Sequence, residues 1–131
     1  MKTMLLLLLT VAGLGCGYKR PSQMTQTGIV PAVAALTPAS QLHGGSDFTL
    51  TVMGTNFNAN AVVNWNAAAQ TGTTHPAANT LSVMIPAGDI STAGTAQVSV
   101  TNPGSTTPGG PYGGGSITPS ETSNTMAFTI N

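Results

Sequence analysis

The stretch Phe48-Thr49-Leu50-Thr51-Val52-Met53 decides the fold of this 131-residue chain, because its apolar residues fall on alternate positions. In an extended chain Phe48, Leu50 and Val52 share one face, and the residues between them take the other. A period of two is the signature of a half-buried β-strand. The stretch is followed by Gly54-Thr55-Asn56, a turn signal. Such a strand needs partner strands that cover its apolar face.

Four further segments alternate in the same way, around residues 63–65, 81–85, 96–100 and 126–130. Turns rich in glycine, proline and asparagine separate them, and no long helical period interrupts the series. We therefore predict an all-β chain that forms an antiparallel β-sandwich of about seven strands. The predicted core consists of Phe48, Leu50, Val52, Phe57, Val63, Trp65, Leu81, Val83, Ile85, Val98, Val100, Phe128 and Ile130.

Several of these segments, in this order, resemble an IPT/TIG domain. They are Ala35 to Ser40, Gly44 to Phe57, Ala61 to Asn66, Asn79 to Ala87, Gly94 to Pro103 and the closing stretch Met126 to Ile130. The resemblance covers residues 34–131 and implies an immunoglobulin-like fold. The chain carries Ala67 where a glycine often follows the Trp-Asn pair of the family.

The N-terminal residues have the parts of a secretory signal peptide. Lys2 supplies the positive start, Met4 to Val11 the apolar stretch, and Gly13 and Gly15 the small residues before a cleavage site. We expect residues 1–15 to be removed and Cys16, the single cysteine of the chain, to become the first residue. The segment Gly13 to Cys16 resembles the lipobox of bacterial lipoproteins, which implies that Cys16 is acylated.

Lipidation predicts a location and one partner. The protein is expected to be secreted across the inner membrane and held in the cell envelope, at the outer membrane, in the periplasm or at the cell surface, with the membrane bound through the lipid. The alternative is an ordinary secreted protein in which Cys16 is an unpaired thiol. Residues 16–33 are polar, and we expect them to form the acylated N-terminus and a flexible tether, either a spacer or padding around the cleavage site.

Composition excludes several classes of function. Only 5% of residues are charged, and after removal of the leader two basic side chains stand against three acidic ones, a net charge of −1. No cluster of basic residues that could bind nucleic acid remains, so no nucleic-acid partner is expected. A single cysteine also excludes a disulfide scaffold, so stability has to come from the apolar core.

Two aromatic residues have alternative roles. Trp65 is in phase with Val63, which favours a core position, although an exposed indole is also a platform for sugars. Tyr112 lies in a Gly/Pro-rich segment, residues 103–124, that we expect to be a long mobile loop. Tyr112 is therefore either a ligand contact at the tip of this loop or an incidental residue of a disordered glycine tract.

Catalytic residues are scarce. His43, His75, Asp47, Asp89 and Glu121 are the only imidazoles and carboxylates of the expected domain, and all fall in or beside predicted loops. No nucleophile elbow, phosphate-binding glycine pattern or metal-ligand spacing accompanies them, so no cofactor and no metal site are expected. Asp89 is expected to cap a short turn through Thr92, with cation binding as the alternative.

Three functions remain open from the sequence. The first is a non-enzymatic, lipid-anchored envelope module that binds a protein or a polysaccharide through loops at one end of its sandwich. The second is a structural spacer lipoprotein without a ligand of its own. The third is a small hydrolase, for which a triad would have to be drawn from residues such as His75 and Asp89.

Overall fold

A computed structural model describes residues 23–131, and these residues form an immunoglobulin-like β-sandwich. Seven strands have four or more residues: β2 (Ala32–Thr37), β4 (Phe48–Thr55), β5 (Val62–Trp65), β7 (Thr74–Ala77), β8 (Thr80–Ile85), β9 (Gly94–Asn102) and β13 (Met126–Ile130). The short elements are β1 (Met24–Thr25), β3 (Ser40–Gln41), β6 (Ala68–Ala69), the 3-10 turn η1 (Ala87–Ile90), β10 (Ser105–Thr107), β11 (Ser116–Thr118) and β12 (Glu121–Thr122). The predicted fold class is confirmed.

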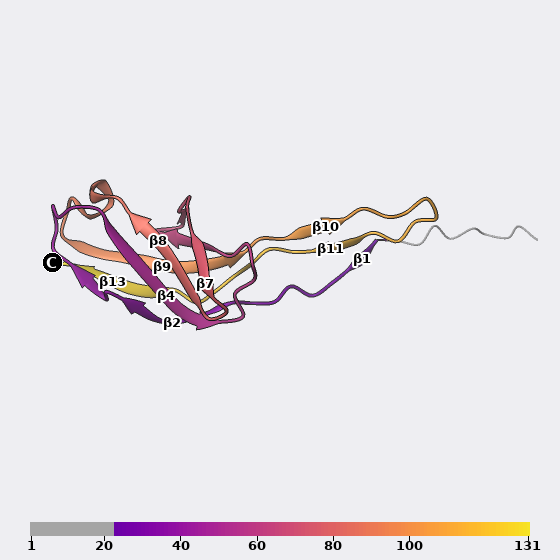
Figure 1. The fold of residues 1–131 in the computed structure, drawn as a ribbon, viewed down its shortest axis with the longest axis horizontal. Helices are drawn as coiled ribbons and strands as arrows, with labels where there is room; N and C mark the ends of the chain where they lie inside the picture. Colours follow the sequence, from indigo (N-terminus) through magenta and orange to yellow (C-terminus); the bar gives the residue numbers. More distant parts are fainter. Residues whose placement is uncertain (1–22) are drawn as a thin grey trace, which may run out of the picture.

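Two sheets face each other in the sandwich. One has the strand order β2-β4-β8-β7, and the other has the order β3-β13-β9-β5-β6, with β12 added beside β9. Neighbouring long strands are antiparallel, as in the pairs of β4 with β8 and of β9 with β13. The C-terminus lies at one end of the sandwich, and a narrow arm projects from the other end (Figure 1). We call these the C-terminal end and the arm end.

The core lies between the two sheets and follows the alternation in the sequence. Leu50 and Val52 of β4 and their partners Val83 and Leu81 of β8 are all at most 2% exposed. Three aromatic rings close the core toward the C-terminal end, with ring centroids of Phe48 and Phe128 5.4 Å apart and those of Trp65 and Phe128 5.1 Å apart. Phe48 is only half-buried, and the other predicted core residues are buried.

Gly54 shows why this strand position needs a glycine. A Cβ atom there would lie 2.0 Å from the Ala32 carbonyl oxygen and 2.6 Å from Cζ of Phe57. The missing side chain lets β2 approach β4 and lets the Phe57 ring cover the end of the core. Phe57 is accordingly buried.

The segment 103–124 contains the three strands β10, β11 and β12 and is not the long mobile loop that we predicted. Strands β10 and β11 pair antiparallel, with Ser105 opposite Thr118 and Thr107 opposite Ser116. Strand β1 adds to β11 in parallel, which places Met24 opposite Ser116. The result is a three-stranded ribbon that extends along the long axis of the molecule (Figure 1). Residues 23–30 and 103–118 together are called the arm below.

Glycine in the arm permits close packing of backbone. A Cβ atom on Gly115 would lie 2.7 Å from the Thr107 carbonyl oxygen, and one on Gly104 would lie 2.6 Å from the Thr118 carbonyl oxygen. Both contacts are shorter than a side chain tolerates, so glycine is needed for β10 and β11 to approach. The composition that suggested disorder is thus a requirement of this narrow ribbon.

Two further segments are more ordered than the sequence indicated. The part of the expected tether after residue 22 contains β1, and β2 of the sandwich begins at Ala32. The stretch between the alternating segments 63–65 and 81–85, which we expected to be a turn, contains β6 and β7, with Pro76 at a register irregularity of the edge strand β7. An edge position beside a bulge is where a strand tolerates proline. Within residues 23–131 no helix has the length and apolar character required to cross a membrane.

Candidate functional site

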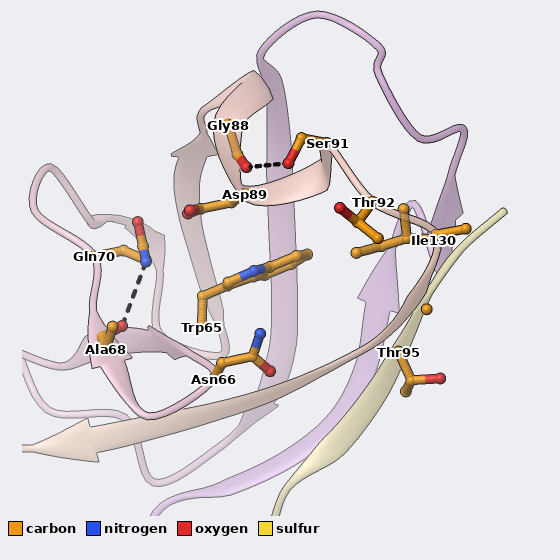
Figure 2. Close-up of a pocket in the computed structure, with 12 residues that line it drawn as sticks. Trp65, Asn66, Ala68, Gln70, Gly88, Asp89, Ser91, Thr92, Thr95 and Ile130 are labelled. Atoms are coloured by element: carbon orange, nitrogen blue, oxygen red, sulfur yellow. Dashed lines mark hydrogen bonds between the residues drawn. The ribbon is translucent and has the colours of Figure 1, made fainter.

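An open cavity of about 470 Å³ lies at the C-terminal end of the sandwich. The segment from the η1 turn to the start of β9 and the β5–β6 hairpin contribute most of its wall (Figure 2). Its lining residues are Trp65, Asn66, Ala68, Gln70, Gly88, Asp89, Ser91, Thr92, Ala93, Gly94, Thr95 and Ile130. Seven of these twelve residues have side chains that are able to form hydrogen bonds, so a polar ligand suits the cavity better than an apolar one.

Trp65 forms part of the cavity wall but is not an exposed platform. Its side chain is 3% exposed, and it packs against Phe128 and, edge-on at a centroid distance of 6.4 Å, against Phe48. The structure therefore places Trp65 in the core, with its indole lining the cavity (Figure 2). Stacking of a sugar on the whole indole face would require this packing to open.

A tight turn fixes Asn66 at the cavity. Asn66 and Ala67 have φ values of 48° and 67°, and they connect β5 to β6 as a two-residue hairpin. Two positive φ values are typical of a type I′ turn, for which Asn-Gly is the preferred sequence. The Asn66 amide N–H donates to the Gln97 carbonyl (2.8 Å), and Asn66 Oδ1 accepts from the Gln97 N–H (2.9 Å). A glycine, which the family often has at position 67, would remove the backbone strain of an alanine in the left-handed conformation.

Asp89 is not the cap that we predicted. It lies inside η1, and its backbone N–H donates to the Pro86 carbonyl oxygen at 3.0 Å. The cap comes from Asp47, whose Oδ1 accepts a hydrogen bond of 2.8 Å from the Ala87 N–H. Asp89 is exposed and its side chain lines the cavity, where no hydrogen bond to another side chain or backbone group within residues 23–131 engages it (Figure 2).

Tyr112 lies at the tip of the arm, at the opposite end of the molecule from the cavity. The Gly113 N–H donates to the Gly110 carbonyl oxygen at 2.9 Å, which closes a turn with Pro111 and Tyr112 in its centre. Proline in the first central position is typical of such turns. Tyr112 is 84% exposed, so its ring is free to contact a ligand or a surface.

The two histidines and the carboxylates do not form a common cluster within residues 23–131. His43 Nδ1 donates to the Asn131 carbonyl oxygen at 2.7 Å, whereas His75 Nε2 donates to the Ala78 carbonyl oxygen at 3.3 Å. Asp89 lines the C-terminal cavity, and His75 lines a second open cavity of about 400 Å³ beside β5. Glu121 lies in β12 at the base of the arm. No three histidine, cysteine, aspartate or glutamate side chains within residues 23–131 are grouped to hold a metal ion.

Asn102 is a structural residue that sequence reasoning missed. The sequence suggested only a turn at this position, but its side chain is 4% exposed and joins three segments at the base of the arm. Nδ2 donates to the carbonyl oxygens of Ile29 and Asn56, both at 2.8 Å, and Oδ1 accepts from the Asn58 N–H at 3.0 Å. These bonds fasten the N-terminal segment and the β4–β5 connection to the end of β9.

Cys16, the predicted lipidation site, lies outside the described residues. The chain nevertheless has a defined entry into the structure, because β1 runs parallel to β11. In β11 the chain returns from the arm tip toward the sandwich, so β1 also runs from tip to sandwich. Residues that precede Met24 are therefore joined to the outer end of the arm.

The sequence profile of the IPT/TIG domain family matches residues 31–114, and the chain belongs to this family. The match begins at the first strand of the sandwich and ends within the arm, so β13, which completes one sheet, follows it. Immunoglobulin-like domains of this class are generally non-catalytic. No curated protein and no solved structure matched the chain.

Proposed function

We propose that the protein is a non-enzymatic binding module, anchored in the cell envelope through an acylated Cys16, that offers the cavity beside Trp65 to a ligand outside the membrane. The observation that carries this proposal is the opposite placement of two features. The chain enters at the outer end of the arm, and the cavity lies at the far end of the sandwich. A lipid at Cys16 then holds the arm end near the membrane and leaves the cavity free.

The chemistry of the cavity favours a ligand with many hydroxyl or amide groups. Asp89 offers an acceptor and Asn66 the donor Nδ2 beside the indole of Trp65. Gln70 adds an amide whose Nε2 donates to the Ala68 carbonyl oxygen at 3.4 Å and whose Oε1 remains an acceptor. Such a mixture suits the sugar units of an envelope polysaccharide, which combine hydrogen-bonding hydroxyls with small apolar patches. A polar protein loop is the other ligand that this chemistry accepts.

Capture from an envelope fraction tests the ligand site. The mature chain with Cys16→Ser is immobilised, and its bound polysaccharide and protein are compared with those of the double variant Gln70→Ala/Asp89→Ala. The matched control is Gln97→Ala, an exposed glutamine of β9 that does not line the cavity. We expect the double variant to lose the ligand and the control to retain it. Equal capture by all three proteins would remove the cavity as the site.

Anchoring is tested separately by metabolic labelling with a palmitate analogue. We expect the wild type to carry the label and to sediment with membranes, and Cys16→Ser to carry none. Label retained in the variant would contradict the lipid anchor.

A spacer lipoprotein without a ligand is the second candidate function, and the arm favours it. The arm separates the sandwich from the point where the chain enters, which is the geometry of a support. Under this alternative the wild type captures neither polysaccharide nor protein above the level of an unrelated immunoglobulin-like domain.

A further inference from the structure

The exposed tip of the arm lies close to the predicted anchor, and this proximity follows from the chain path. Met24 pairs with Ser116, so the residue that enters the arm is four residues from Tyr112 along the opposite strand. At 3.3–3.6 Å per residue the tip extends at most about 14 Å past this pair. Cys16 precedes Met24 by eight residues, which span at most about 28 Å. The tether is thus long enough for Tyr112 to reach the membrane in which Cys16 is anchored.

The surface of the arm suits the interface of a bilayer. Residues 23–30 and 103–118 contain no charged side chain, while Met24 is 75% exposed and Tyr112 84% exposed. Tyrosine concentrates at the boundary between lipid headgroups and hydrocarbon, where its ring is partly buried and its hydroxyl stays hydrated. Placing these residues in the headgroup region desolvates no charge.

The distribution of charged residues along the molecule also favours placing the arm at the membrane. Lys19 and Arg20 follow Cys16 closely in the sequence and lie before the arm. Of the three acidic residues, Asp47 and Asp89 lie at the C-terminal end, and Glu121 lies at the base of the arm. Basic residues next to an anchor are attracted by anionic headgroups, and acidic residues are repelled by them. The charge distribution therefore favours an orientation with the arm toward the membrane and the cavity away from it.

We propose that the tip of the arm, centred on Tyr112, rests in the headgroup region of the membrane that holds the acylated Cys16 and so sets the orientation of the sandwich. This inference rests on the lipid anchor of the proposed function. A single aromatic contact is weak for a free domain. The tether, however, keeps the tip at a high effective concentration near the surface, so that a weak contact is sufficient to select one orientation.

The test uses the acylated full chain in vesicles of phosphatidylethanolamine and phosphatidylglycerol. Cys16 is the only cysteine, so a second cysteine gives the acylated protein one free thiol for an environment-sensitive fluorophore. Thr107→Cys places the fluorophore at the outer end of the exposed strand β10, opposite Ser116, and leaves Tyr112 intact. Leu42→Cys is the matched control, since Leu42 is 70% exposed and lies beside His43 at the C-terminal end. Lipids with a nitroxide near the headgroup serve as quenchers.

We expect at least twofold quenching of the Thr107 probe by the nitroxide lipid and no quenching of the Leu42 probe. Adding Tyr112→Ser should reduce quenching at Thr107 to the level of the Leu42 control. Circular dichroism should be unchanged, because Tyr112 makes no packing contact with the core cluster of residues 23–131.

Three results would overturn the inference. Equal quenching at Thr107 and Leu42 would show that the arm does not orient the domain, and quenching at Thr107 that survives Tyr112→Ser would remove Tyr112 as the contact. Quenching that increases with the surface density of the protein, and does not depend on the amount of nitroxide lipid, would show contact between arms of neighbouring copies. In each case the palmitate label on Cys16 remains, so the anchor stands. A chain without label would instead overturn the anchor and this inference together.

Discussion

The sandwich and the arm are built from the same polar, weakly charged sequence, but different forces hold them together. The sandwich buries a continuous cluster of apolar side chains, and among residues 23–131 no member of that cluster comes from the arm. The arm is held by backbone hydrogen bonds such as that from the Met24 N–H to the Gly115 carbonyl oxygen, 3.0 Å, and by close backbone contact at its glycines. Side-chain burial fixes the first region, and backbone geometry fixes the second.

This difference predicts different stability in the two regions. Burial of apolar surface is the dominant favourable term in folding, so the sandwich should unfold only globally. Backbone hydrogen bonds near solvent contribute little net free energy each, so the arm should open locally while the sandwich stays folded. The predictions below change one region at a time and are given from the largest expected effect to the smallest.

Trp65→Ala should have the largest effect, because it removes a ring that packs against Phe48 and Phe128. Loss of a buried tryptophan costs about 3–5 kcal/mol in the free energy of unfolding, a large part of the about 5–15 kcal/mol of a typical domain. Urea unfolding measures it, with the exposed Met84→Ala of β8 as the control. An unfolding free energy of Trp65→Ala within about 1 kcal/mol of the wild-type value would mean that the aromatic group is not part of the core.

Asn102→Ala should weaken the junction between the two regions. The change leaves the carbonyl oxygens of Ile29 and Asn56 and the N–H of Asn58 without their partner. We expect a loss of about 1–3 kcal/mol in unfolding free energy, since these three hydrogen bonds are part-buried and a polar group left without its partner costs about that much. Hydrogen exchange should also rise in residues 23–30. The exposed Asn60→Ala is the control, and equal effects of the two variants would contradict this role.

Gly115→Ala should open the arm and leave the sandwich unchanged. The added methyl group would lie 2.7 Å from the Thr107 carbonyl oxygen, so β10 and β11 have to separate. We expect about tenfold faster amide exchange at Met24 and Thr107, equivalent to about 1.4 kcal/mol. Gly110→Ala is the matched control, because a Cβ atom at Gly110 meets nothing within 4 Å. Unchanged exchange in Gly115→Ala would show that close backbone contact does not hold the arm.

Ala67→Gly should have the smallest effect and the opposite sign. Ala67 has a φ of 67°, a left-handed conformation that costs an alanine about 1 kcal/mol. The unfolding free energy should therefore rise by about that amount in urea. Ala68→Gly, in the adjacent strand β6, should lower it instead. A lower stability of Ala67→Gly would mean that the β5–β6 turn differs from the one described.

The sandwich was predictable from the sequence because strands with one buried face have apolar residues at alternate positions. Alternation around Leu50, Leu81 and Val98 identifies strands and their inward faces without knowledge of their partners. The family match over residues 31–114 adds the topology that alternation alone does not give.

The arm and the details of the cavity have no such pattern in the sequence. Strand β1 pairs with a segment some 90 residues away through polar residues without a period, as the pair Met24 and Ser116 shows. Glycine that permits close contact is indistinguishable in sequence from glycine that permits flexibility. The cap of η1 comes from Asp47, 40 residues before its partner Ala87, so the local sequence indicates Asp89 and gives no sign of Asp47.

The distance between the two ends of the molecule tests the central claim most directly. Spin labels at Thr107→Cys and Leu42→Cys in the mature chain with Cys16→Ser report on the outer part of the arm and on the C-terminal end of the sandwich. If the arm is an ordered ribbon directed away from the cavity, pulsed electron resonance should give one narrow distribution of long distances. A broad distribution, as from an unstructured loop, or a short distance, as from an arm folded back onto the sheet, would contradict it.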